Sequence, residues 1–351
     1  MHMADALLSP AVGFAMCAVS GAAIGASVTK VKKDELGEKK IPIMGVAGAL
    51  VFAGQMINFT IPATGSSGHI GGGILLAGLL GGVPAFLSIT VVVIIQCLFF
   101  ADGGLLALGC NIFNLGVVPC LIIYPLVFRP ILKAGTDRRR LSAASVLSAV
   151  TGAGLGAFCV VLQTLLSGIT ALPFITFTTF MVPVHLVIGL VEGVVTAAVL
   201  SFVYKTRPDI IDSAQHGGRL GGVSTGKVVA ALTALTIVAG CGLSLFASGN
   251  PDGLEWAVGR TAGTEIEAGG GVPGGSIIGG SMFDASMFDG AASVQESTAF
   301  LPGYAFASDP ENAVGTAAAG LVGAAATFAL AGATGLVITL AKKGKKGAAD
   351  A

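Results

Sequence analysis

The residues of this chain best able to do chemistry are nitrogen donors near its start. The sequence begins Met1-His2-Met3, and a further histidine, His69, ends the Gly- and Ser-rich segment 65–69. A metal ion bound by the α-amine of Met1 and the backbone nitrogen of His2 closes one chelate ring, and Nδ1 of His2 closes a second. His69 completes a planar set of four nitrogens, which favours Ni²⁺ or Cu²⁺ and places Co²⁺ lower. The alternatives are a frayed terminus at His2 and a helix-capping role for His69.

Other polar side chains interrupt the apolar runs, where burying them is costly. His185 and Glu192 are two helical turns apart and therefore share one face of a helix. We interpret such side chains as a hydrogen-bonded network that orients the ligating groups. The alternative is hydrogen bonding that only holds helices together. The candidates are Gln55, Asn58, Asn111, Asn114, His185 and Glu192, and the same runs also contain Gln96 and Asp102.

The composition is that of a membrane protein. Hydrophobic residues make up 54% of the 351 positions, charged residues only 11%, and the mean hydropathy is +0.87. Soluble domains carry about 25% charged residues. The net charge of zero gives no electrostatic reason to expect a nucleic-acid partner. The six cysteines show no C-x-x-C spacing, so neither a zinc cluster nor a disulfide framework is expected.

Apolar segments long enough to cross a bilayer predict about nine crossings and an all-α polytopic fold. Basic clusters follow the first, fifth, seventh and last segments, so all of them fall on one side, as cytoplasmic loops require. The N-terminus and His69 then lie on the outer face and the C-terminus inside. The expected segments are about 8–29, 41–61, 70–100 split in two at Gly81–Pro84, 105–128, 141–166, 181–204, 228–247 and 313–341.

The chain divides into a close-spaced bundle, a linker and a C-terminal hairpin. We place them at 1–205, 206–226 and 227–351, with an outer loop at 248–312. That loop is Gly-rich and contains the tandem repeat SMFDASMFDG, which predicts a mobile segment with little packed core. The stretch GGVSTGK at 221–227 matches the start of a phosphate-binding loop, but Val228 replaces the required Ser or Thr. The sequence therefore predicts no nucleotide-binding site in this stretch.

Several segments resemble a known family. The start MHMADALLSP is similar to M-H-I-P-D-G-F-L-S-P of the CbiM/NikM family, the substrate-specific (S) components of energy-coupling-factor ABC importers for cobalt and nickel. QMINFTIPATGSSGHIGGG, DGGLLALGCNIFNLGVV and VHLVIGLVEG resemble further stretches of the family, in order, to about residue 205. PDGLEW at 251–256 and LPGYAF at 301–306 resemble the PDGLE (NikN-like) domain, so the chain looks like a fusion of the two.

The resemblance implies a seven-helix S-component bundle whose N-terminus is inserted at the outer face, plus a two-helix transmembrane hairpin. It implies that Met1, His2 and His69 hold Ni²⁺ or Co²⁺ as the transported substrate, with no bound cofactor, and that Asp5 hydrogen-bonds or caps near the site. The family's Ile, Pro and Gly are replaced here by Met3, Ala4 and Ala6, and without the proline the inserted turn is less preorganised.

The implied setting is the cytoplasmic membrane of a bacterium or archaeon. The implied partners are a membrane T-component (CbiQ/NikQ-like), ATPase subunits (CbiO/NikO-like) and lipid. Uptake would serve nickel enzymes or cobalamin biosynthesis, and the hairpin would assist metal loading or release.

A hydrolase and an ATP-independent metal channel or transporter are the two other classes of protein to consider. A hydrolase is disfavoured because the sequence contains neither G-x-S-x-G nor H-E-x-x-H. An ATP-independent metal channel or secondary transporter is the remaining alternative, although a pore is more commonly lined by rings of charged or carbonyl groups than by a closed nitrogen chelate.

Overall fold

A computed structural model gives the fold of this chain. It describes residues 1–33, 40–217, 220, 224–263, 289–306, 308–309 and 312–347. The helices are η1 (Asp5–Leu7), α1 (Pro10–Lys33), α2 (Lys40–Gln55), α3 (Gly73–Leu80), α4 (Gly82–Phe100), α5 (Leu108–Ile112), η2 (Phe113–Phe128), α6 (Arg129–Leu132), α7 (Arg138–Ser167), α8 (Phe174–Thr206), α9 (Pro208–His216), α10 (Gly226–Ile237), η3 (Val238–Gly242), η4 (Leu243–Phe246), α11 (Gly253–Ala262), α13 (Asp289–Thr298), η6 (Pro302–Tyr304) and α14 (Ala313–Gly347).

The fold is an all-α membrane bundle, with one small exception. Strands β1 (Phe59–Ile61) and β2 (Ser66–Gly68) form an antiparallel hairpin, in which Phe59 pairs with Gly68 and Ile61 with Ser66. The second apolar run was expected to continue as helix to Ile61, but α2 ends at Gln55. The hairpin matters for the site because His69 directly follows β2.

Within the described residues, seven helices are long and apolar enough to cross a membrane, fewer than the nine crossings predicted from hydropathy. The apolar stretch 70–100 does split at Gly81, whose φ of +88° breaks the helix. However, α3 has only 8 residues, a rise of about 12 Å against a hydrocarbon core of about 30 Å. Helix α2, with 16 residues, is also short of a full span. Both helices are almost wholly buried among their neighbours, which is why they read as spans in the sequence.

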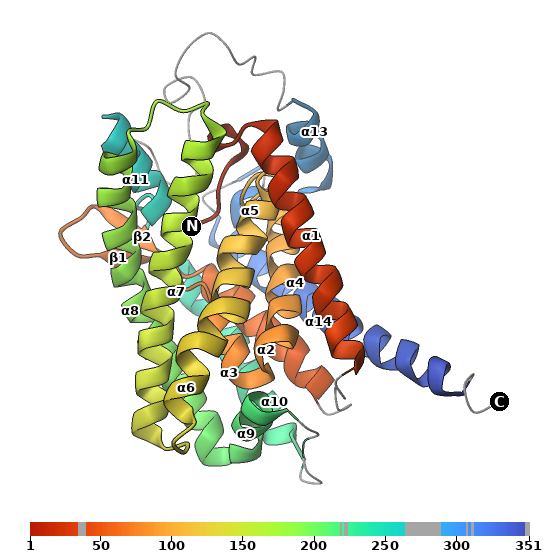
Figure 1. The fold of residues 1–351 in the computed structure, drawn as a ribbon. Helices are drawn as coiled ribbons and strands as arrows, with labels where there is room; N and C mark the ends of the chain where they lie inside the picture. Colours follow the sequence, from red (N-terminus) through yellow and green to blue (C-terminus); the bar gives the residue numbers. More distant parts are fainter. Residues whose placement is uncertain are drawn as a thin grey trace.

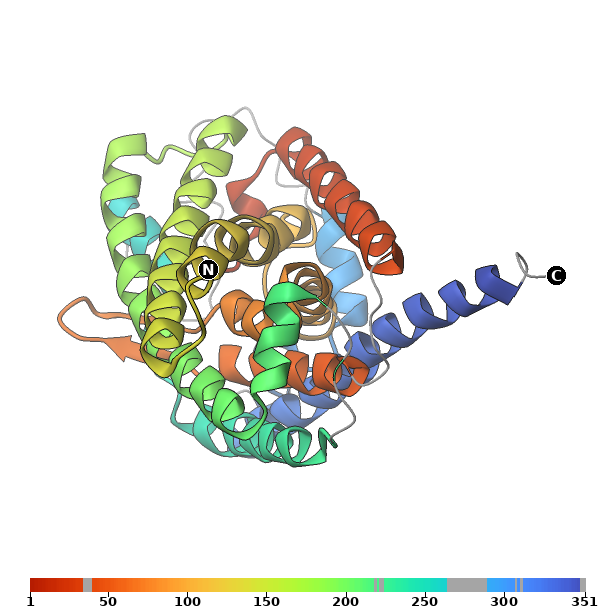
Figure 2. The same cartoon turned by 60° about the horizontal axis from the view of Figure 1, so that its bottom comes forward.

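The helices surround the start of the chain. Helices α7 and α8 pack along each other as an antiparallel pair, and α14 packs along α2 (Figure 1). With the bottom of Figure 1 turned forward, the helices are arranged around the centre of the molecule, and the C-terminal part of α14 extends away from them (Figure 2). In the C-terminal hairpin, Gly320 of α14 lies directly against the backbone of Gly240 in η3. Glycine at both positions lets the two backbones approach, as small residues do between membrane helices.

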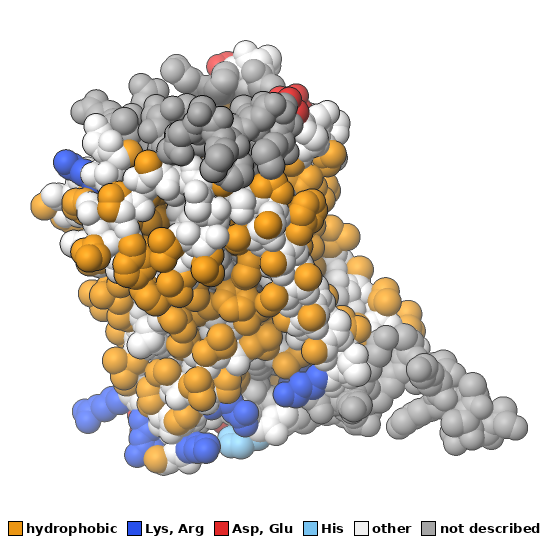
Figure 3. Space-filling view, turned by 45° about the horizontal axis from the view of Figure 1, so that its top comes forward, with side chains coloured by type: hydrophobic (Ala, Val, Ile, Leu, Met, Phe, Trp, Pro, Cys, Tyr) orange, Lys and Arg blue, Asp and Glu red, His pale blue; other side chains and the backbone are white. Residues whose placement is uncertain are grey.

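The surface carries a wide apolar belt, with Lys and Arg gathered mainly at one end (Figure 3). Exposed apolar side chains are frequent on α7, α8 and α14, among them Leu166, Ile175, Val194 and Val337. A water-soluble protein rarely exposes such a surface, whereas lipid covers it without cost. The chain is therefore a multi-pass membrane protein.

The outer loop was predicted to have little packed core; this is wrong for α11, whereas α13 has no buried residue. Helix α11 buries Leu254, Ala257 and Val258 in a cluster with Met3 and Leu7. A reciprocal cap starts this helix at Asp252, a local signal that the Gly-rich composition obscured. The repeat segment 281–288 lies outside the described residues, as does the 221–223 part of GGVSTGK. The expected linker contains helix α9, whose Ile210 and Ile211 are buried.

Candidate metal centre

The first residues of the chain lie inside the bundle. The backbone N–H of Met3 donates to Oδ1 of Asn111 at 2.7 Å, and Nδ2 of Asn111 donates to the carbonyl of Met3 at 3.2 Å. The N–H of Gly104 donates to the same carbonyl at 2.8 Å. The side chain of Met1 reaches the space above Gly156 of α7, where a methyl group would touch it. These contacts satisfy the inserted backbone, so that burying it is not penalised.

Asp5 anchors the segment to the loop after α4. Its Oδ1 accepts the N–H of Ala107 at 2.8 Å. Burial raises the pKa of the Asp5 carboxyl above its usual value, while the neighbouring backbone N–H groups counteract this. A Cβ on Gly104 would collide with Asp5, so only glycine permits this close approach. The Asp5 carboxylate therefore joins the chain start to the loop at Ala107, and its role toward a metal stays a prediction.

His69 presents a free lone pair to the chain start. Its Nδ1 lies 3.1 Å from the carbonyl oxygen of Ile70. A carbonyl oxygen only accepts, so Nδ1 carries the hydrogen and Nε2 is unprotonated. Nε2 lies 3.1 Å from the Met1 amine, which donates to it. Burial, with the nearby Met1 ammonium and His2, lowers the pKa of His69 to about 3, so the imidazole is neutral and able to bind a metal.

The loop following His69 is held from both sides. The Glu192 carboxylate accepts the N–H groups of Gly71 and Gly72 at 2.9 Å each. From the other side, Nε2 of Gln55 donates to the carbonyl of Gly71 at 2.8 Å. Two of the predicted orienting residues therefore position the backbone next to His69 rather than its ring.

The His2 ring stacks on the His69 ring, with centroids 5.3 Å apart and an interplanar angle of 17°. Its Nε2 lies 3.1 Å from Oε1 of Gln96, and its Nδ1 lies 3.3 Å from Oδ1 of Asp102. Burial lowers the pKa of His2, although Asp102 opposes the shift. Metal binding through Nδ1 requires the ring hydrogen on Nε2, where the Gln96 oxygen is placed to accept it.

Two residues of the C-terminal region reach the same place. The Met1 amine donates to Oδ2 of Asp252 at 2.8 Å. Burial would raise the pKa of Asp252, but the Met1 ammonium and His69 outweigh it and the pKa lies below the usual value. The hydroxyl of Tyr304 donates to Oδ2 of Asp102, and its ring stacks on Phe100 with centroids 4.9 Å apart. The sequence contained both residues in recognisable segments, yet no local signal placed either beside Met1.

The remaining predicted residues differ in their hydrogen-bond partners. Asn114 exchanges hydrogen bonds with Gln163 at 2.8 and 3.1 Å and also contacts the sulfur of Met3, so it supports the inserted segment. Nδ1 of His185 lies 2.8 Å from the carbonyl of Met181, and its Nε2 is buried without a partner in the described structure. The side-chain oxygen of Asn58 is likewise unpartnered in the described structure, and Asn58 lines a cavity together with His2 and His69.

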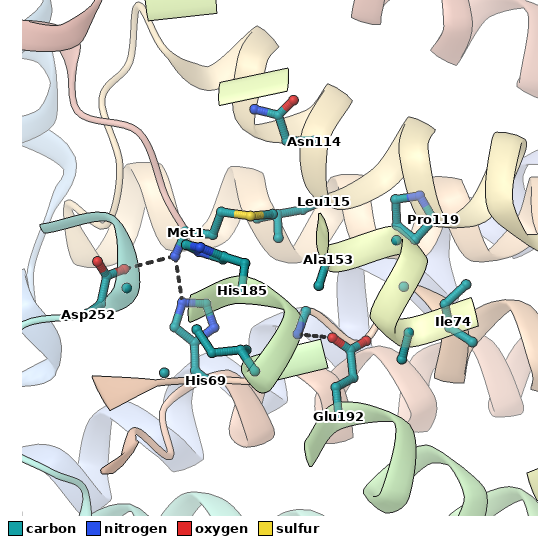
Figure 4. A pocket seen from close by; sticks show the side chains of 17 residues that line it. Met1, His69, Ile74, Asn114, Leu115, Pro119, Ala153, His185, Glu192 and Asp252 are labelled. Carbon is teal, nitrogen blue, oxygen red and sulfur yellow. Dashed lines mark hydrogen bonds and ion pairs between the residues drawn. The ribbon is translucent and has the colours of Figure 1, made fainter. Parts of the chain in front are cut away.

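Two spaces adjoin the centre. A small pocket with a free volume of about 40 Å³ is lined by Met1, His69, His185, Glu192 and Asp252 (Figure 4). A larger cavity of about 450 Å³ lies on the other side of His2 and His69, between the bundle and the C-terminal region. A cavity needs about 10–15 Å³ of such volume to hold one water. The small pocket therefore has room for a few water molecules, whereas the larger cavity has room for a hydrated metal ion.

The arrangement can hold a transition metal only if backbone and terminal nitrogens take part. Among the described residues, no three His, Cys, Asp or Glu side chains are grouped so as to bind a metal. Met1, His2 and His69 are nevertheless together, because the amine donates to one ring and the two rings stack (Figure 4 shows the amine, His69 and Asp252). Nitrogen donors of this kind suit Ni²⁺, Cu²⁺ and Co²⁺ better than Mg²⁺ or Ca²⁺.

Comparison with known proteins agrees with this chemistry. Residues 2–210 match the family described as cobalt uptake substrate-specific transmembrane region (CbiM), and residues 226–340 match the PDGLE domain. A putative metal transport protein of Haloquadratum walsbyi is 37% identical over 213 residues, covering 60% of this chain and 93% of that protein. A putative fused nickel transport protein NikMN of Archaeoglobus fulgidus is 34% identical over 220 residues, covering 63% and 71%. A crystal structure of a transition metal transporter superposes with a TM-score of 0.52 at 30% identity, covering 59% of this chain and 93% of the other.

Proposed function

Because the chain belongs to the CbiM family of cobalt-uptake transmembrane regions and carries a PDGLE domain, we propose that it captures Ni²⁺ or Co²⁺ at the outer membrane face. It then acts as the substrate-binding subunit of an energy-coupling-factor ABC importer. The family and its relatives are transport proteins, in agreement with a transporter rather than an enzyme. The relatives thus support transition-metal uptake, and we propose the ligands that capture the metal and the importer that uses it.

One observation carries the proposal: the chain start is folded inward so that the Met1 amine lies 3.1 Å from Nε2 of His69. In the metal-bound state the ligands are the Met1 amine, the backbone and Nδ1 nitrogens of His2, and Nε2 of His69. The Met1 amine gives up the proton that makes it an ammonium, the backbone amide of His2 gives up its N–H proton, and both protons pass to water in the cavity beside His2 and His69. Nδ1 of His2 turns from Asp102 to the metal. Gln96 then accepts from Nε2 of His2 and fixes the ring.

The donor set favours Ni²⁺. Four nitrogens in a plane suit Ni²⁺ and Cu²⁺ through geometry, and Co²⁺ ranks below both in affinity. Relatives are named both for nickel and for cobalt transport, so either use is represented in the family. We propose nickel as the preferred ion and cobalt as the second. The imported metal would serve nickel enzymes or cobalamin biosynthesis.

Energy coupling is proposed to come from other subunits. The phosphate-loop-like stretch lacks the hydroxyl residue that holds Mg²⁺, with Val228 in its place. A membrane T-component and two ATPase subunits, CbiQ/NikQ-like and CbiO/NikO-like, complete the importer in this proposal. We place the N-terminus outside and the C-terminus inside the cytoplasmic membrane, because basic residues gather at one end of the molecule. The units are 1–205 for capture, 206–226 as linker and 227–351 as the C-terminal domain.

The test is metal binding by purified protein with its native start. Wild type should retain one Ni²⁺ per chain, and His2→Ala, His69→Ala or one residue added before Met1 should abolish retention while expression in the membrane continues. His216→Ala is the matched control, because His216 is exposed on α9 and its Nδ1 lies 3.2 Å from the carbonyl oxygen of Asp212 in the same helix. Normal metal content in the extended protein would reject the amine as a ligand.

The alternative of an ATP-independent channel or secondary transporter is separated by uptake into proteoliposomes. We expect no uptake by the chain alone and ATP-dependent uptake once the T-component and ATPase subunits are present. Uptake without ATP would favour the alternative.

A further inference from the structure

We propose that Asp252, supplied by the C-terminal domain, is a fifth metal ligand, so that the metal site is shared between the two domains. This inference rests on the proposed function. Oδ2 of Asp252 lies 2.8 Å from the Met1 nitrogen, which itself lies 3.1 Å from Nε2 of His69. Metal–nitrogen and metal–carboxylate bonds are both about 2.0–2.2 Å long. An ion bound to the Met1 nitrogen is therefore within reach of Oδ2 after a small shift.

The two oxygens of the Asp252 carboxylate have different partners: one caps helix α11 and the other faces the metal site. Oδ1 of Asp252 accepts the N–H groups of Leu254 and Glu255 at 2.8 Å each. Oε2 of Glu255 accepts the N–H of Asp252 at 3.0 Å and completes a capping box at the start of α11. This reciprocal pair fixes the side chain of Asp252 in one rotamer. Only Oδ2 remains, and it points at the Met1 amine (Figure 4).

The turn that carries Asp252 is docked on the hairpin that carries His69. The N–H of Ser67 donates to the carbonyl of Pro251 at 2.7 Å, and Nε1 of Trp256 donates to the carbonyl of Thr64 at 2.9 Å. Gly253 lies on the His185 ring, since a Cβ there would come within 3.0 Å of Cε1. The position of Oδ2 relative to His69 is therefore determined by rigid contacts rather than by a free loop.

Charge gives the reason for ligation. In the metal-free state the carboxylate faces an ammonium, and the pair is largely buried, with side chains 10% and 19% exposed. A nitrogen that binds a metal does so through the electron pair that held the proton, so the positive charge facing Asp252 passes from the ammonium to the metal. A buried carboxylate left without a cation is strongly unfavourable. Coordination by Oδ2 keeps it paired and adds an anionic donor to a site that otherwise consists of nitrogens.

The added oxygen changes which metals fit. Four nitrogens alone favour a planar ion, whereas four nitrogens and one oxygen also accommodate Co²⁺, which has no preference for a plane. Planar four-nitrogen Ni²⁺ is diamagnetic, and a fifth oxygen donor makes it paramagnetic. The spin state of bound Ni²⁺ is therefore a direct readout of ligation by Asp252.

The experiment compares wild type with Asp252→Ser, both full-length, with the native start and loaded with Ni²⁺ alone. Serine is a good N-cap and preserves the start of α11, but its hydroxyl is too short to reach the Met1 amine. We expect paramagnetic Ni²⁺ in wild type and diamagnetic Ni²⁺ in the variant, with affinity at least about tenfold lower in the variant. Glu296→Gln, which neutralises an exposed carboxylate on α13, is the matched control and should keep the wild-type spin state.

Equal spin states in wild type and Asp252→Ser would overturn the inference, even if the affinity fell, because Asp252 would then only pair with the amine. His69→Ala separates this outcome from failure of the proposed function. If His69→Ala loses Ni²⁺ while Asp252→Ser keeps the wild-type spin state, only the shared ligand is wrong. If His69→Ala keeps Ni²⁺, the nitrogen chelate itself is wrong.

Discussion

Replacing Gly104 by alanine should displace the inserted chain start without unfolding the bundle. A Cβ at this position would lie 2.5 Å from the backbone nitrogen of Asp5 and closer still to its carboxylate. Ordinary contact begins at 3.4 Å, so the Asp5 segment must move by about 1 Å to make room. Gly104 does not have a positive φ, so the backbone itself tolerates alanine.

The expected loss follows from two contacts that such a shift breaks. One is the charge-assisted bond from Ala107 to Asp5, and the other is the bond from the N–H of Gly104 to the carbonyl of Met3. Together they are worth about 2–4 kcal/mol. If the inserted conformation of the chain start is destabilised by this free energy, the apparent metal affinity falls by about 30- to 1,000-fold.

The assay is competition for Ni²⁺ against a chelator of known affinity, with thermal unfolding followed in parallel. Gly21→Ala is the matched control, since a Cβ at Gly21 meets nothing within 4 Å. It should bind Ni²⁺ as wild type does. Affinity of Gly104→Ala within about threefold of wild type, with unchanged unfolding temperature, would refute the reasoning.

Three further substitutions probe the surroundings of the site. Tyr304→Phe removes the hydroxyl that donates to Asp102 and keeps the ring. Ni²⁺ affinity should fall by about tenfold in the same competition assay. An unchanged affinity would mean that the Tyr304 hydroxyl does not influence metal binding through Asp102 and His2. Glu192→Gln leaves one of the two glycine N–H groups without an acceptor and the other with a neutral one, which should cost about 1–3 kcal/mol of stability, measured by thermal unfolding. No loss would mean that the loop after β2 is held by other contacts. Gly320→Ala places a methyl group against the backbone of η3, and overpacking of about 1–3 kcal/mol should lower the unfolding temperature; an equal or higher temperature would contradict the close approach of η3 and α14.

Hydropathy predicted where most helices lie because lipid and protein interior select the same residues. The runs 8–29 and 141–166 correspond to α1 and α7 within a few residues. Hydropathy does not distinguish a helix that crosses the membrane from a short helix buried inside the bundle. Helix α3 is as apolar as α4, yet it stops after 8 residues at Gly81. Where a helix ends inside a bundle depends on its neighbours, which a single sequence does not display.

The nearness of Met1, His2 and His69 was predictable because their chemistry is specific: an amine and two imidazoles form a recognisable donor set. That they bind a metal remains a prediction. The position of Asp252 beside Met1 was not predictable, although its segment was recognised. The distance between the two residues depends on how the turn before α11 docks on β1 and β2. The orienting role suggested for Asn58 stays a prediction, because its side-chain oxygen has no hydrogen-bond partner in the described structure.

The ion pair of Met1 and Asp252 joins positions 251 residues apart on one polypeptide. Both partners are therefore delivered in equal number, and they meet at an effective concentration that, for tethered groups, is about millimolar. Two separate proteins would have to find each other in the membrane, and their encounter would depend on how much of each the cell makes. Cutting the chain between α9 and α10 should thus turn a dilution-independent contact into one that weakens as the two pieces are spread over more lipid.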